Sequence, residues 1–389
     1  MPRFSPRLLA TAAACLTTGI AAAQGVSSTP SATASTAPVA YVYVSSQPGG
    51  TGHIYGYAAS ASGQLTPVAG SPFSSTASAL ALNGKWLFGS HLQSNLIYSY
   101  AIAANGSIKQ ADSYDSSPYT APNDLFLDHT GASLYVGFSD GVGDNGYEAL
   151  NINQTTGKLS LVNASYTGVG EFFQMTFIGD NKFAYGNTCY HFDPTIYGFA
   201  RVSGGGLSSL GTDAPLPTAP SGDQYCPLGG TATDPYNDVV VPLQQIPSDG
   251  GNPTAFKLAV YTSDPYGKLS TTSTAANMAT VQVEPDTLAM SPKGFYLAAA
   301  NSDPSGVGPN GGIQVFLMHG SKPLTVLTGV VIPGVYVNQM YWDNNEHLYA
   351  VSNGSGKLYV FNVSTSGTTQ VAGSPYSIPS PSGLIVLPK

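Results

Sequence analysis

The chain has 389 residues, of which only 9% are charged, and carries a net charge of −8 with an isoelectric point of about 5.0. No stripe of Lys and Arg is present, which argues against binding to nucleic acid or to an anionic membrane surface. The 45 Gly, 29 Pro and 24 Tyr residues favour short strands and many turns over helices. The sequence therefore predicts an all-β protein, and its length fits either two domains or one domain built from repeats.

Residues 1–23 have the pattern of a secretory signal. Arg3 and Arg7 precede an apolar segment, and Ala21-Ala22-Ala23 forms a cleavage site before Gln24. The apolar segment is too short, and too interrupted by Thr and Gly, to predict a membrane span. A lipoprotein modified at Cys15 is the alternative. We expect a periplasmic or extracellular protein.

Residues 24–38 consist almost entirely of Ser, Thr, Ala and Pro, which predicts a disordered linker. The folded domain is then expected at 39–389. Removal of the signal leaves two cysteines, Cys189 and Cys226, and an even count in an exported protein favours one disulfide. A pair of buried thiols is the alternative.

From residue 39 onward, a unit of four strands can be placed seven times. The outer-strand segments VAGSPF at 68–73 and VAGSPY at 371–376 are nearly identical, although they lie some three hundred residues apart, which indicates internal repetition. Inner strands are predicted to begin near Ala79, Asp124, Gln174, Gly230, Thr287, Gln339 and Gly383. Second strands are predicted at 41–44, 86–88, 134–137, 183–186, 239–241, 296–299 and 348–351. Third strands are predicted at 54–58, 96–102, 147–152, 196–201, 256–261, 313–318 and 358–363.

The two ends of this domain are each incomplete. The first predicted strand, Tyr41–Val44, has no inner partner before it, and the last, Leu384–Leu387, has no second strand after it. If the two pair, the chain closes into a ring and no sheet edge is left open at the joint. Sheets that are apolar on both faces then stack radially, which predicts a seven-bladed β-propeller. Two stacked sandwiches are the competing arrangement.

The repeats resemble those of the lactonase-like seven-bladed propellers, the family of bacterial 6-phosphogluconolactonases and YVTN-repeat proteins. The segments that carry the resemblance are YVYVS at 41–45, IYGY at 54–57, GQLTPV at 63–68, GSPF at 70–73 and PDTLAMSPKG at 285–294. This resemblance covers about residues 39–389. It implies a propeller fold and, in members that act on lactones, a group of His, Arg and Glu at one mouth of the central channel.

This chain departs from the expected catalytic group. After the signal it has a single arginine, Arg201, on a predicted third strand, and CPLGG at 226–230 stands where a histidine motif could open the fifth unit. No catalytic residue can therefore be transferred from the family by position.

In an antiparallel blade, the loops after the second and fourth strands share one face with the start of the inner strand. Both cysteines are expected on that face, together with a set of candidate site residues. The acidic candidates are Asp124, Glu171, Glu284 and Asp286, and the histidine candidate is His191. Converging carboxylates could act as acid or base or bind a metal. The alternative is that they cap loops in water.

Tyr190, Tyr225 and Tyr336 are candidate ligand-binding residues near the same face, although tyrosine also packs blades together. The segments 140–146 and 301–312, rich in Asp, Asn and Gly, suit calcium, but ordinary turn chemistry explains them as well. No resident cofactor or metal is predicted beyond this calcium possibility.

Three functions follow from these observations. The first is a monomeric binding scaffold for a small-molecule, carbohydrate or protein ligand. The second is a lactone hydrolase with a divergent, acid-rich site. The third is a structural component of the cell envelope.

Overall fold

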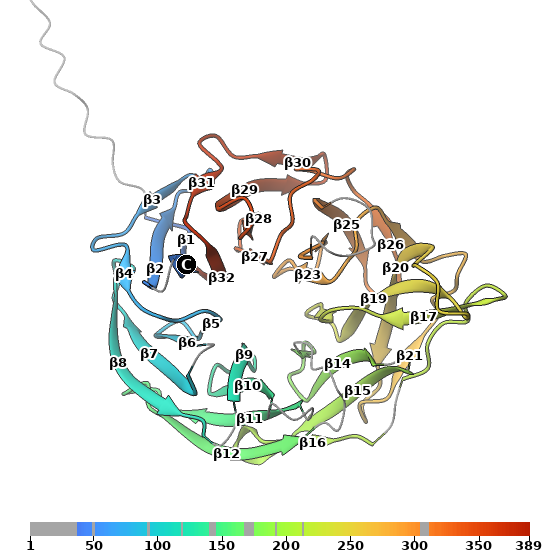
Figure 1. The fold of residues 1–389 in the computed structure, drawn as a ribbon, viewed down its shortest axis with the longest axis horizontal. Helices are drawn as coiled ribbons and strands as arrows, with labels where there is room; N and C mark the ends of the chain where they lie inside the picture. Colours follow the sequence, from blue (N-terminus) through green and yellow to red (C-terminus); the bar gives the residue numbers. More distant parts are fainter. Residues whose placement is uncertain are drawn as a thin grey trace, which may run out of the picture. The chain divides into compact units, whose positions relative to one another are not determined.

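A computed structural model describes residues 37–48, 51–91, 94–117, 120–139, 145–166, 175–190, 193–211, 214–303 and 311–389. Within them, seven antiparallel sheets of at least four strands form the blades of a propeller, as predicted (Figure 1). Each blade runs from an inner strand at the centre of the ring to an outer strand at its rim. The seven-bladed prediction is thus confirmed within the described residues, and the segments predicted as the signal and most of the linker lie outside them.

The strands of blades 1 to 4 follow one plan. Blade 1 contains β32 (Pro381–Pro388), β1 (Ala40–Ser46), β2 (His53–Ala59), β3 (Leu65–Pro67) and β4 (Phe73–Ser74). Blade 2 contains β5 (Leu80–Leu82), β6 (Trp86–Ser90), β7 (Leu96–Ile102) and β8 (Ile108–Asp115). Blade 3 contains β9 (Thr120–Leu127), β10 (Ser133–Ser139), β11 (Asn145–Ile152) and β12 (Leu159–Tyr166). Blade 4 contains β13 (Thr176–Phe177), β14 (Phe183–Tyr190), β15 (Asp193–Arg201), the 3-10 turn η2 (Ser203–Gly205) and β16 (Leu207–Ser209).

Blades 5 to 7 repeat the plan with additions at the edges. Blade 5 contains β18 (Ala232–Thr233), β19 (Asp238–Pro247), β20 (Ala255–Ser263) and β21 (Leu269–Thr271), joined by β17 (Asp223–Pro227) and β22 (Ala279–Val281). Blade 6 contains β23 (Thr287–Met290), β24 (Tyr296–Ala300), β25 (Ile313–His319) and β26 (Lys322–Val326). Blade 7 contains β27 (Gln339–Trp342), β28 (His347–Ser352), β29 (Lys357–Ser364), β30 (Gly367–Gln370) and β31 (Tyr376–Ser377).

The C-terminal strand β32 closes the ring. It pairs antiparallel with β1 from Ala40 opposite Pro388 to Ser46 opposite Pro381. The backbone N–H of Leu384 also donates to the side-chain oxygen of Gln339 in blade 7 at 2.6 Å. The predicted closure is confirmed, and the closing strand is bonded to the blades on both sides of the joint.

The two near-identical outer segments make the same local bonds. Ser71 Oγ accepts the N–H of Gly56 at 2.9 Å, and Ser374 Oγ accepts the N–H of Val360 at the same distance. Val68 in the first segment bonds back to the third strand of its blade, as Val371 does in the second. The repetition in the sequence therefore corresponds to a repeated structure.

Blade 5 extends further than its sequence suggested. The predicted second strand at 239–241 is the middle of the ten-residue β19, and Cys226 lies in β17, a strand that pairs with the far end of β19, where a loop was expected. Cys189 likewise lies inside β14, where the prediction placed it after the strand. Backbone pairing continues here through polar residues such as Asn187 and Thr188, so the end of the apolar pattern did not mark the end of the strand.

Cys189 and Cys226 form the predicted disulfide, with their Cα atoms 5.5 Å apart. The bond joins the strand extensions of blades 4 and 5. The two cysteines are 37 residues apart in the sequence, and the segment between them includes the outer strand of blade 4. The disulfide therefore restrains two neighbouring blades on the face where the inner strands begin.

On four successive blades, a side-chain hydroxyl donates a hydrogen bond to the equivalent turn of the next blade. The acceptor is the carbonyl of the glycine in the turn before the outer strand. The pairs are Tyr43 to Gly106 (2.8 Å), Ser99 to Gly157 (2.8 Å), Tyr135 to Gly205 (2.6 Å) and Tyr185 to Gly267 (2.8 Å). Glycine is required at 106 because its φ is +80° and an added Cβ would lie 2.5 Å from the Tyr41 ring. In the fourth unit the left-handed residues are Gly204 and Gly205.

We predict that Tyr43→Phe destabilises the ring. The Tyr43 side chain is fully buried, so the substitution leaves the Gly106 carbonyl without this donor, at a cost of about 1–3 kcal/mol. Urea unfolding measures the change. The matched control is Tyr266→Phe, where the side chain is 84% exposed and we expect no change in stability. Equal stability of the two variants would show that the bond between blades contributes nothing.

Candidate functional site

The inner strands surround a central cavity of about 740 Å³. Its wall is formed by residues from all seven blades, from Ala81 of blade 2 to Ile385 of the closing strand. Most of the lining is apolar, including the half-buried side chains of Leu288 and Met290. A cavity of this size and character is typical of small-molecule sites.

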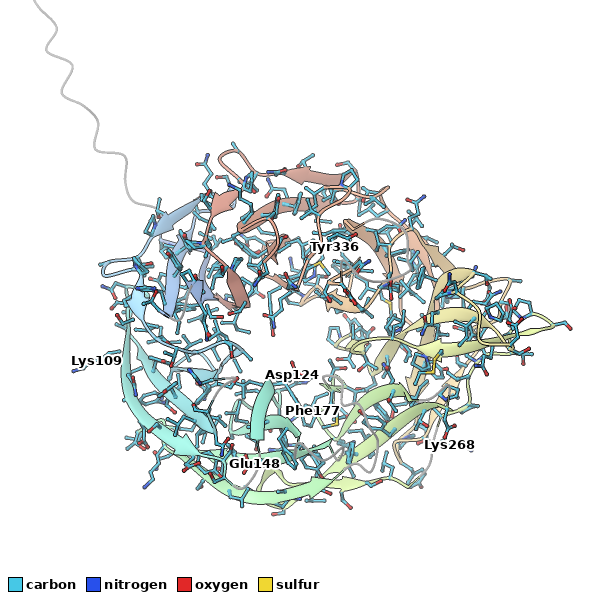
Figure 2. The ribbon with its side chains drawn as sticks, in the orientation of Figure 1. Lys109, Asp124, Glu148, Phe177, Lys268 and Tyr336 are labelled. Carbon is cyan, nitrogen blue, oxygen red and sulfur yellow. A yellow bond between two sulfur atoms is a disulfide. The ribbon has the colours of Figure 1, made fainter. Side chains whose placement is uncertain are left out.

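Asp124 lies on the inner strand β9 and lines this cavity (Figure 2). Its carboxylate accepts no hydrogen bond from any residue that the structure describes. Burial among the inner strands raises the pKa of Asp124 to about 6. An acid in this condition changes its protonation near neutral pH, which is characteristic of functional carboxyl groups.

Asp286 precedes the inner strand β23 and lines the same cavity. The backbone N–H of Ser302 donates to both of its carboxylate oxygens, at 2.9 and 3.1 Å, and the Ser302 hydroxyl donates at 2.7 Å. Burial raises the pKa of Asp286, and the bonds from Ser302 oppose that rise. Asp286 is therefore a carboxylate already supplied with donors by the protein.

Glycine permits a close backbone approach beside Asp286. Gly229 has a φ of +49°, and a Cβ at this position would lie 1.8 Å from the Asp286 carbonyl oxygen. The CPLGG segment at 226–230 thus brings the entry of blade 5 against blade 6 at the channel. The segment has a packing role here, in the place where the resemblance suggested a histidine motif.

Positive charge lies away from the channel. No Lys or Arg is among the described residues that line the cavity. Lys109 and Lys268 lie at the rim of the ring, whereas Asp124 lies at its inner edge (Figure 2). Arg201 pairs with the buried Asp128 of blade 3 at 2.5 Å, so it joins two blades outside the cavity lining.

The remaining sequence candidates have varied positions. Glu284 is half-buried just before β23 and does not line the cavity. Tyr225 is 2% exposed and packs in the core between blades 4 and 5. Tyr336 is half-buried near the inner part of the ring (Figure 2). Glu171, His191 and the side chain of Tyr190 lie outside the described residues. Their roles stay predictions, and Asp124 and Asp286 are the two acidic candidates that the structure brings to one cavity.

The sequence did not reveal a buried cluster in blade 7. Asp343 accepts hydrogen bonds from His347 Nδ1 at 2.7 Å and from the Tyr349 hydroxyl at 2.9 Å. Burial alone would raise the pKa of Asp343, but these bonds lower it below its usual value. The cluster is enclosed and does not line the cavity, so we interpret it as structural.

The Asp of this cluster occupies a position in the hairpin between the first and second strands that recurs in other blades. Asp343 Oδ1 accepts the backbone N–H of His347 at 3.0 Å, and Asp234 Oδ1 accepts that of Asp238 at 2.9 Å in the corresponding hairpin of blade 5. Asp128 occupies the same position in blade 3. These acids stabilise the turn between the first and second strands, and an alignment of the repeats with one another would have found them.

A second overlooked acid is Glu148 on β11. It is 1% exposed and accepts a hydrogen bond from the Tyr114 hydroxyl at 3.1 Å. Burial raises the pKa of Glu148 to about 7. The sequence did not indicate that Glu148 is buried, because a Glu in a third strand is usually exposed to solvent.

The described residues place two limits on the site. They contain no group of three or more His, Cys, Asp or Glu side chains close enough to hold a metal ion. They also contain no helix of the length and hydropathy that crossing a bilayer requires. The two calcium-like segments, 140–146 and 301–312, fall largely on residues that are not described.

Comparison with known proteins identifies the fold. The chain is similar to a Bacteroides uniformis protein provisionally named a 6-phosphogluconolactonase (TM-score 0.65, 13% identity, 90% of this chain and 99% of that chain). It is also similar to the periplasmic gluconolactonase of Pseudomonas aeruginosa (TM-score 0.62, 14% identity, 90% and 99%) and to a Lactobacillus plantarum protein (TM-score 0.64, 15% identity, 90% and 99%). No protein-family model matches the chain, and no curated protein does. The resemblance to lactonase-like propellers is therefore confirmed at the level of fold.

We predict that Asp124→Asn stabilises the protein near pH 7 and has little effect near pH 4. The pKa of Asp124 is raised on folding, so its ionised form is destabilising and wild-type stability falls as the pH rises through about 6. The neutral amide avoids this loss, which we expect to be on the order of 1–3 kcal/mol. Urea unfolding of both proteins at the two pH values measures the difference. A difference that does not depend on pH would contradict the assigned pKa.

Proposed function

We propose that this protein is an exported binding propeller that holds a small organic ligand in its central channel. The observation that carries the proposal is the cavity of about 740 Å³, apolar over most of its wall and equipped with two carboxylates. Export is supported by the signal pattern of residues 1–23.

The composition of the wall indicates which ligands suit it. Apolar side chains favour a ligand with an apolar body, and a few polar groups fix its orientation. A sugar phosphate suits it poorly, because its charge would meet Asp124 and Asp286 with no Lys or Arg among the described lining residues. The proposal thus separates this protein from one that acts on phosphorylated lactones.

Lactone hydrolysis is the second candidate, and one observation favours it. Asp124 has a pKa of about 6, so near neutral pH it could take a proton from the water that attacks a lactone carbonyl. Proteins of the same fold include one named a periplasmic gluconolactonase. We rank this candidate second because no Lys or Arg is among the described lining residues, and the ring of His129, the histidine of that lining, contacts Phe177 and makes no hydrogen bond to Asp124.

Trp342 provides a direct test of channel binding. It lines the cavity, whereas Trp86, the only other tryptophan in the chain, does not. In a Trp86→Phe background, we expect the Trp342 emission to change and saturate with a member of a panel of neutral sugars, sugar lactones and aromatic amines. No change with any member, on a protein that folds normally, would contradict the proposal.

A lactone hydrolysis assay distinguishes the binding protein from the hydrolase. If the protein only binds, D-glucono-1,5-lactone is hydrolysed no faster with the protein than without it. Hydrolysis above the spontaneous rate that is lost in Asp124→Asn would favour the hydrolase. Glucose-6-phosphate should produce no saturable signal, and tight binding of this sugar phosphate would contradict the charge argument.

A further inference from the structure

We propose that the ligand of the channel is an organic cation, whose positive group pairs with Asp124 while its apolar body packs on the channel wall. This inference rests on the proposed function and adds the chemical class of the ligand. It is carried by the cavity, by the different hydrogen bonding of its two carboxylates and by the distribution of charge around it.

The two carboxylates of the channel differ in their partners. Asp286 receives three donor contacts from Ser302, whereas Asp124 receives none from the described residues. A partly buried carboxylate without donors or a cation is unfavourable when ionised. A ligand that brings a positive group would supply Asp124 with a partner that the described residues do not provide, so its binding is favoured over that of a neutral ligand of the same shape.

The surroundings of the channel also favour a cation. The chain has 21 acidic and 13 basic residues, and none of the basic residues is among the described cavity lining. Lys109 and Lys268 are at the rim of the ring (Figure 2). A concave site with carboxylates and low-polarity walls concentrates the negative potential and so raises the local concentration of cations.

Two aromatic residues contribute to the apolar wall near Asp124. Phe126 lies two residues further along β9, on the same side of the strand as Asp124, and Phe177 of blade 4 lines the same cavity. Both rings pack against Tyr135, with centroid distances of 5.4 and 5.1 Å. Phe126 and Phe177 are only 6% and 2% exposed, so their rings form the apolar backing of the channel wall between blades 3 and 4 and do not offer a free ring face to an ammonium group.

A bare metal ion fits the channel less well. Calcium takes six to eight oxygen ligands, and the described residues contain no group of three or more side chains suited to a metal. A carboxylate that receives no donor from the described residues, in a largely apolar wall, matches an ammonium group on an organic body. Asp286 and His129 are the other titratable groups of the described lining, apart from the half-buried Tyr341.

Three probes of nearly the same shape test the inference: 2-phenylethylamine, which is cationic, 2-phenylethanol, which is neutral, and phenylacetate, which is anionic. Their dissociation constants are measured near neutral pH by ligand-observed NMR titration of the wild-type protein, of Asp124→Asn and of Asp249→Asn. Asp249 is exposed and outside the cavity lining, so its variant has the same change in net charge and serves as the control.

We expect wild-type protein to bind the amine at least about tenfold more tightly than the alcohol, a difference of about 1.4 kcal/mol. Phenylacetate should bind most weakly. Asp124→Asn should bring amine and alcohol to within about twofold of each other, and Asp249→Asn should keep the wild-type preference.

Three results would overturn the inference. If the alcohol binds as tightly as the amine and changes the Trp342 emission, the channel is a binding site but not one for cations. If the preference for the amine persists in Asp124→Asn, the cation is held elsewhere. If the amine does not bind at millimolar concentration while a neutral sugar or lactone of the earlier panel does, the proposed function stands and the cation is excluded.

Discussion

The pairing of β32 with β1 is the constraint on which the rest of the structure depends. Among the residues that the structure describes, blade 1 has no other inner strand, and the wall of the cavity is incomplete without Ile385. The core between blades 7 and 1 combines residues from both ends of the domain, among them Val42, Val351 and Leu384, all fully buried. Since each blade packs only on its two neighbours, an open joint would expose two apolar faces at once.

The closed ring explains how distant residues come to share one site. All inner strands run in the same direction, so their first residues meet at one mouth of the channel. Asp124, inside β9, and Asp286, just before β23, are far apart in the sequence but line one cavity because the inner strands of all blades form its wall. Hydrogen bonding then distinguishes acids with a structural role from those open to a ligand. Asp343 is enclosed and supplied with donors, whereas Asp124 lines the channel and receives no donor from the residues that the structure describes.

The repeat architecture and its closure could be predicted because they depend on short-range patterns. Alternation marked strands such as β7 (Leu96–Ile102) at their true limits, and the two VAGSP segments revealed the repeat. Neither the additional strand β17 nor the full length of β19 could be predicted, because backbone pairing continues there beyond the apolar pattern. The disulfide was predicted from the even cysteine count and from the expected position of both cysteines on one face, and the structure confirms it.

The site was predictable only in part. The sequence predicted an inner strand beginning near Asp124 and so placed this residue at the channel, although β9 begins at Thr120. That no described residue donates a hydrogen bond to Asp124 depends on residues distant in sequence. Tyr225 shows the opposite limit, since a loop residue near the mouth was expected to be available to a ligand and instead packs between two blades. Side-chain direction within irregular segments is set by tertiary contacts, which no local pattern encodes.

Amide hydrogen exchange of the closing strand tests the central claim most directly. If β32 completes blade 1, the amides of residues 384–387 exchange as slowly as those of residues 42–44, because both open only when the ring opens. Fast exchange at 384–387, with residues 42–44 and the second strands of the other blades still protected, would show a frayed terminus and contradict the closed ring.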